Sequence, residues 1–157
     1  MKPGTLFATP PGTWWARWIC RVLGASTFHW GIVIGPVGDD FMVSESLGKG
    51  TAICRLKGRK ARFFKIKGLP ELSPIDIVKW HSRYGDYRYD YDVFLSTAIW
   101  WLLKHYLGKA IPVIHDDEVH CQEWTVLFGS DHCVNIIPEE EYPTCTNLEH
   151  SPFLEEI

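Results

Sequence analysis

The stretch TFHWGIVIGPVGDDFMVSES, residues 27–46, decides the fold. Its β-branched and aromatic residues gather in two segments, 30–34 and 41–44, on either side of the turn-forming letters GPVGD. Two such runs around a short Gly-containing connection are typical of a β-hairpin. We expect a three-residue loop at 36–38, with its glycine in the left-handed conformation that such loops need.

This loop fixes a register for the hairpin. Gly35 then faces Asp39, and His29 at the start of the first strand faces Glu45 at the end of the second. Directly opposed residues share a sheet face with Cβ atoms roughly 5 Å apart, so we expect the imidazole and the carboxylate to form a hydrogen bond. A slip of one residue would replace Glu45 with one of its two flanking serines.

Periodicity and capping residues predict the other elements. Thr13 caps a helix at 14–23, which ends before Gly24. We expect its tryptophans to dock against the domain, with a membrane-surface or acyl-chain contact as the alternative. Two more strands, TAICRLK and ARFFKIKGL, are joined by GRK and complete a small antiparallel sheet. Further helices are expected at 75–84, 93–107 and 119–129, followed by a tail that wraps the domain as an ordered loop.

Length and composition favour a single α+β domain over residues 1–157. The net charge of -3 and the lack of any long basic run exclude a typical nucleic-acid-binding protein. Five cysteines without a C-x-x-C pair predict neither a disulfide framework nor a zinc ribbon. The N-terminus lacks the apolar core of a signal peptide, and 93–107 is too short to span a bilayer. We therefore expect a soluble, cytoplasmic protein without a cofactor.

Cys121 is the candidate nucleophile. It falls in the first turn of the predicted helix at 119–129, where unpaired N–H groups and the helix dipole favour a thiolate. The same N–H groups are suited to hold the oxyanion of a tetrahedral intermediate. We hypothesise a catalytic triad in which His29 is the base and Glu45 orients the imidazole. Taken alone, a cysteine on an apolar helix is more often an inert core residue.

Other residues carry alternative interpretations. His120 is interpreted as a residue on the rim of the pocket, because adjacent helical residues do not face each other. Tyr89 and Tyr91 either line the cleft or pack below the sheet. The remaining four cysteines are interpreted as small buried hydrophobic residues. Another alternative is a metal site near the start of the helix at 119–129. The side chains there that could bind a metal are His115, Asp116, Asp117, Glu118, His120, His132 and Cys133. They lack the spacing of a helical metal motif.

Several of these motifs occur together in one family. PGTLFAT near the N-terminus, HWGIVI, a strand ending in SES, YDYD before a helix and HCQEW at the start of another resemble the permuted NlpC-like cysteine peptidases. More narrowly, the chain resembles the YiiX-like branch, which is related to lecithin-retinol acyltransferase proteins. The resemblance covers about residues 2–128, and NLEHSPF is similar to the tail of these proteins.

The resemblance implies a circularly permuted papain-like domain in which the histidine strand precedes the cysteine helix. It implies Cys121 as nucleophile, His29 as base and Glu45 as the third polar residue. One departure is Gln122, which stands where many relatives have Ser, and this departure concerns the substrate more than the mechanism.

The leading expectation is a cysteine hydrolase of the amidase or peptidase type, acting on a small peptide or an acyl-containing substrate through an acyl-enzyme. Alternatives are an acyltransferase or thioesterase on lipid-like acyl substrates, and a non-catalytic module that binds a peptide or lipid headgroup. A peptidoglycan substrate would require access outside the cytoplasm, as in phage-associated or lysis-released enzymes.

Overall fold

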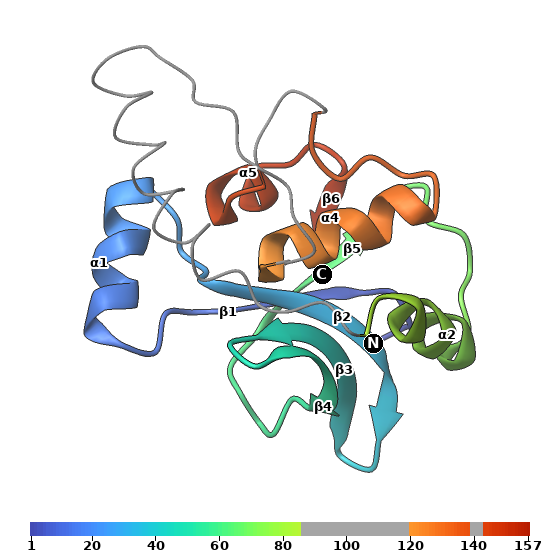
Figure 1. Cartoon of the computed structure of the whole chain (residues 1–157). Helices are drawn as coiled ribbons and strands as arrows, with labels where there is room; N and C mark the ends of the chain where they lie inside the picture. Colours follow the sequence, from blue (N-terminus) through green and yellow to red (C-terminus); the bar gives the residue numbers. More distant parts are fainter. Residues whose placement is uncertain (86–119, 139–142) are drawn as a thin grey trace.

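The computed structural model describes residues 1–85, 120–138 and 143–157. In these ranges the chain has an α+β fold, and its strands form one six-stranded antiparallel sheet in the order β4-β3-β2-β1-β5-β6 (Figure 1). The strands are β1 (Leu6–Thr9), β2 (His29–Val37), β3 (Asp40–Leu47), β4 (Gly50–Arg55), β5 (Arg62–Ile66) and β6 (Leu154–Glu156).

Several of the described helices begin next to a residue whose side chain caps the first turn. They are α1 (Trp14–Leu23), α2 (Pro74–Tyr84), α4 (Cys121–Asp131) and α5 (Cys145–Glu149). Thr13 accepts a hydrogen bond from the Ala16 N–H, and Gly24 ends α1 with φ of 69°. Ser73 forms a capping box at the start of α2. The predicted bounds of these two helices are confirmed to within one residue.

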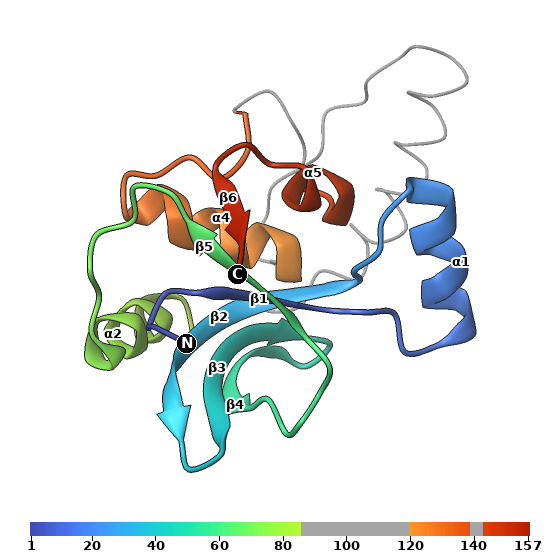
Figure 2. The ribbon, with the colours of Figure 1, turned by 180° about the vertical axis from the view of Figure 1, so that it is seen from behind.

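The sheet has an apolar layer on each face. Trp30, Ile32 and Ile34 of β2 belong to the main core, which also contains Trp124 and Phe128 of α4. Alternate residues of the same strand point the other way, and Val33 packs there in a smaller cluster with Phe7, Val43 and Leu56. Figures 1 and 2 show α4 and α5 together over one side of the sheet, with α2 beside them.

The hairpin of β2 and β3 is confirmed, but its predicted register is wrong. Val37 pairs with Asp40, so the connection has two residues instead of three. A β-bulge then shifts the pairing between Val33 and Gly35, and Glu45 lies opposite Gly31 instead of His29. The sequence pattern does not reveal the bulge, because an extra residue in one strand is set by packing on both faces.

Several strands differ from the sequence-based expectation. β1 was not anticipated, yet it lies inside the sheet between β2 and β5. β4 pairs with β3 and β5 pairs with β1, so the two strands on either side of GRK lie apart. The expected loop-like tail contains α5 and the edge strand β6.

Of the tryptophans of α1, Trp14 and Trp18 do not dock against the domain as expected, whereas Trp15 packs on Phe28. Trp14 and Trp18 are 81% and 63% exposed, whereas the buried residues of α1 are Ala16 and Cys20. The periodicity of the sequence identifies an apolar face but does not tell which medium it contacts.

The predicted helix at 93–107 lies outside the described residues. None of the helices in residues 1–85, 120–138 and 143–157 combines the length and the apolar character that a bilayer crossing needs.

Candidate active site

Cys121 is the first residue of α4, as the sequence predicted to within one turn. His120 precedes it as the N-cap, with extended backbone dihedrals of -92° and 170°. Cys121 is only 4% exposed, and α4 packs on β2, the strand that carries His29. The thiol therefore lies at the positive end of a helix and faces the sheet.

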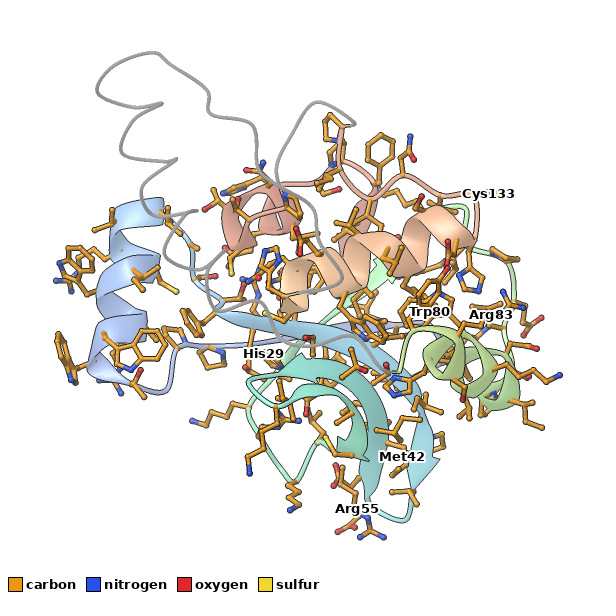
Figure 3. All side chains as sticks on the ribbon, in the orientation of Figure 1. His29, Met42, Arg55, Trp80, Arg83 and Cys133 are labelled. Carbon is orange, nitrogen blue, oxygen red and sulfur yellow. The ribbon has the colours of Figure 1, made fainter. Side chains whose placement is uncertain are left out.

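His29 is the first residue of β2 and joins two elements of the site. Its Nε2 lies 2.6 Å from Oε2 of Glu45 on β3. His29 is two residues from Gly31, the direct partner of Glu45, so imidazole and carboxylate are diagonal neighbours on one face. Figure 3 shows His29 at the end of the sheet where α4 begins.

The imidazole of His29 also interacts with the Cys121 thiol, since each group shifts the pKa of the other. Because Nε2 faces Glu45, Nδ1 is the nitrogen that remains for the sulfur. Burial opposes a charge on His29, but the sulfur and the carboxylate outweigh it and raise the pKa of the imidazole to about 9. The structure thus brings together all three residues that the sequence singled out.

The ionisation of Cys121 follows from the same contacts. Burial by itself would raise the pKa of the thiol. The charge and hydrogen bond of His29, the charge of His120 and a hydrogen bond from the Trp30 backbone together lower that pKa. These contacts make Cys121 more readily ionised than an ordinary cysteine.

Glu45 is held by more than the histidine. Arg59 donates from Nη1 to Oε2 at 3.0 Å and from Nη2 to Oε1 at 2.8 Å, and the Cys54 thiol donates to Oε1 at 2.7 Å. Burial alone would raise the pKa of Glu45, but the hydrogen bonds from His29 and Arg59 lower it to about 2. The carboxylate is 1% exposed and fully partnered, so it keeps its charge and its orientation.

Sequence reasoning missed both Arg59 and Cys54. Arg59 lies in the segment between β4 and β5, where no local pattern predicts a contact with β3. Cys54 faces Val43, two residues from Glu45, and the pairing of β3 with β4 puts it on the face of that carboxylate. A correct prediction of the hairpin of β3 and β4 would have identified Cys54 as a neighbour of Glu45. The contact of Arg59 with Glu45, by contrast, depends on the tertiary fold.

His120 is a buried cap, so its interpretation as a residue on the pocket rim is wrong. Its Nδ1 lies 2.6 Å from Oε2 of Glu123, and its Nε2 lies 3.2 Å from the backbone oxygen of Pro143. Both neighbouring groups are acceptors, an arrangement that favours a proton on each ring nitrogen. Burial works against this charge, but the Glu123 carboxylate prevails and raises the pKa of His120. A second histidine with a raised pKa therefore lies next to Cys121.

Gln122 connects Cys121 with a second buried cysteine. Its Nε2 donates to the backbone oxygen of Phe28 at 3.1 Å, which fixes the amide orientation and turns Oε1 toward the Cys121 sulfur, 3.2 Å away. Nε2 also lies 2.7 Å from the sulfur of Cys145. Burial raises the pKa of Cys145 well above that of an ordinary thiol, so this cysteine stays protonated.

The sequence predicted that the other four cysteines are small buried hydrophobic residues, but only two of them are buried. Cys20 and Cys145 are buried, but Cys54 is half-buried and Cys133 is exposed at the far end of α4 (Figure 3). Burial raises the pKa of the Cys20 thiol to about 11, and burial together with Glu45 does the same for Cys54.

The alternative sites lie largely beyond the part of the chain that the structure describes. This applies to Tyr89, Tyr91 and the acidic cluster with His115. Among the residues with described positions, no three His, Cys, Asp or Glu side chains gather as metal ligands.

No family model matches the sequence, and no curated protein is similar to it. The resemblance to the permuted NlpC-like peptidases therefore remains a prediction, and the function has to be argued from the geometry of the site.

Proposed function

We propose that the protein is a thiol-dependent hydrolase of the amidase or peptidase type that acts through an acyl-enzyme on Cys121. The observation that carries the proposal is the imidazole of His29, whose Nε2 lies 2.6 Å from Oε2 of Glu45 and which interacts electrostatically with the Cys121 thiol. Nucleophile, base and orienting acid in this order are the arrangement of a catalytic triad.

The first half of the reaction forms the acyl-enzyme. His29 takes the thiol proton, and the sulfur of Cys121 attacks the carbonyl carbon of the substrate. The backbone N–H groups in the first turn of α4 point toward the developing oxyanion. When the tetrahedral intermediate collapses, the imidazolium returns its proton to the leaving amine or alkoxide, and the acyl group stays on sulfur as a thioester.

The second half releases the acyl group. His29 takes a proton from a water molecule, which attacks the thioester carbon, and the sulfur leaves as thiolate paired with the imidazolium. Glu45 stays ionised throughout, because its low pKa, about 2, keeps it from competing for the proton. Its role is to orient the imidazole and stabilise its cationic form.

We assign the fold, within the α+β class, to the circularly permuted papain-like type. The support is the chain order, in which the strand with His29 precedes the helix that begins at Cys121, and the antiparallel sheet against which that helix packs. The substrate class follows from the chemistry of the site as an amide, ester or thioester.

Acylation by an activated ester tests the proposal. The full-length protein is mixed with 4-nitrophenyl acetate, nitrophenolate release is followed by absorbance, and the acylated peptide is identified by mass spectrometry. We expect a burst of about one equivalent with the acetyl group on Cys121. Cys121→Ala should abolish the burst, and His29→Gln should slow it by about 100-fold or more.

Cys133→Ser is the matched control, because Cys133 is the exposed cysteine at the other end of α4. Its burst should equal that of the unmodified protein. Acylation spread evenly over the cysteines, or a burst unaffected by His29→Gln, would overturn the proposal.

A further inference from the structure

α1 presents a large apolar face to solvent. Trp14, Trp18 and Val22 follow one another at a spacing of four residues and form a stripe along the helix. Their exposed fractions are 81%, 63% and 38%, and Trp15 beside them is 42% exposed. Single exposed apolar residues are common, but a contiguous stripe of large apolar side chains on one helix marks an interaction surface.

The opposite side of α1 attaches the helix to the domain through small residues. Ala16 and Cys20 are its buried positions, and the Cys20 thiol donates to the backbone oxygen of Thr27 at 3.2 Å. Trp14 and Trp18, by contrast, are mostly exposed to solvent. Figures 1 and 2 show α1 at one end of the molecule, beside the start of β2.

Two cations border this stripe. Arg17 and Arg21 follow Trp14 and Trp18 by three residues each, and both are exposed. α1 contains no acidic residue, although the chain as a whole carries a net charge of -3. Positive charge is therefore concentrated beside the exposed tryptophans of α1, where it complements an anionic surface.

We infer that α1 is a membrane-surface helix, which lays Trp14, Trp18 and Val22 into the headgroup region of a bilayer that contains anionic lipids. Indole rings prefer this interface because one side is apolar and the N–H reaches water or headgroups. Arg17 and Arg21 lie at the border of the apolar stripe, where guanidinium groups bind lipid phosphates. The inference rests on α1 alone and holds with or without the thiol chemistry.

The helix also lies close to the candidate active site. Trp15 packs edge-to-face on Phe28, with ring centroids 5.2 Å apart, and Phe28 directly precedes His29. A bilayer bound by α1 would therefore lie near the strand end that carries the imidazole.

Vesicle flotation of the full-length protein tests the inference. The probes are phosphatidylcholine vesicles with and without phosphatidylglycerol. We expect the protein to float with the anionic vesicles and more weakly with the neutral ones. The double variant Trp14→Ser/Trp18→Ser should weaken binding by about tenfold or more. Arg17→Glu/Arg21→Glu should remove the preference for anionic lipid.

Ile75→Ser/Val78→Ser is the matched control, since both residues are exposed apolar side chains on α2, at 64% and 39%. It should bind vesicles like the unmodified protein. Because all substituted residues are exposed, unchanged circular dichroism and melting temperature will establish that the variants fold. Lack of flotation with either vesicle, or equal binding by the α1 variants, would overturn the inference, as would dimerisation through α1 without vesicle binding.

Discussion

His29 and Glu45 meet diagonally across the hairpin of β2 and β3, with Nε2 and Oε2 2.6 Å apart. The two-residue connection alone would place Glu45 opposite Ile32, on the face that packs against α4. The bulge between Val33 and Gly35 changes this pairing, so that Glu45 faces Gly31 and shares a face with His29. One extra residue in β2 thus decides whether the carboxylate reaches the imidazole.

Gly31→Ala should disrupt this pairing. A Cβ at position 31 would lie 2.5 Å from Cε1 of the buried Phe7 ring and 2.8 Å from the backbone oxygen of Ser44. Neither neighbour has space to retreat, so we expect a loss of about 1–3 kcal/mol in the free energy of unfolding. Gly12→Ala is the control, because a Cβ there meets nothing within 4 Å. Urea denaturation of both variants measures the difference, and equal stability would contradict the prediction.

Arg59→Met should destabilise the fold because it removes two hydrogen bonds from a buried carboxylate. Arg59 is about one-third exposed, so the expected cost is about 2 kcal/mol, below that of breaking a fully buried pair. The control is Arg62→Met, which breaks a bidentate pair with Glu156 at the surface and should cost less than about 1 kcal/mol. Urea denaturation at neutral pH compares the two variants.

The pH dependence of the Arg59→Met effect follows from Glu45. The folded pKa of this carboxyl is about 2, below its ordinary value of 4.5. Its stabilising contribution is therefore present above pH 4.5 and is lost as the pH falls toward 2. Without Arg59 the folded pKa rises, so the stability difference between the variant and the unmodified protein should shrink with falling pH. A difference that does not depend on pH would mean that Arg59 acts through packing alone.

Local signals predicted the ends of the helices and the two strands around GPVGD, because caps, glycines and β-branched runs act within a few residues. The same signals placed Cys121 at a helix start. The bulge, the insertion of β1 into the sheet and the contact of Arg59 with Glu45 depend on residues far apart in the chain, so no local pattern encodes them. The predicted register placed Glu45 opposite His29, whereas it lies opposite Gly31. This shift of two residues leaves both side chains on the same face of the sheet.

His120→Asn should raise the pKa of the Cys121 thiol. Asparagine is a good N-cap residue, so α4 keeps its start while the neighbouring positive charge is lost. The shift should be smaller than that of His29→Gln, because His29 contributes both a charge and a hydrogen bond. The pH dependence of thiolate absorbance, measured against Cys121→Ala, gives the pKa. His132→Asn at the other end of α4 is the control, and an unchanged pKa in His120→Asn would show that the charge of His120 has no effect on the thiol.

Iodoacetamide at mildly acidic pH should label Cys121 before the other cysteines. Cys20 and Cys54 have pKa values raised to about 11 and Cys145 lies well above the ordinary value, so these three remain unreactive thiols.

The labelling rate of Cys121 should rise through its lowered pKa and reach a plateau that extends toward pH 9, where His29 loses its proton. Below that pH the thiolate is paired with an imidazolium, and above it the sulfur is an unpaired thiolate. His29→Gln should remove the plateau and return the rate to that of an ordinary thiol, while Cys133→Ser removes the exposed competitor. Mass spectrometry of each peptide follows the reaction, and uniform slow labelling of all cysteines would contradict an activated thiol at the start of α4.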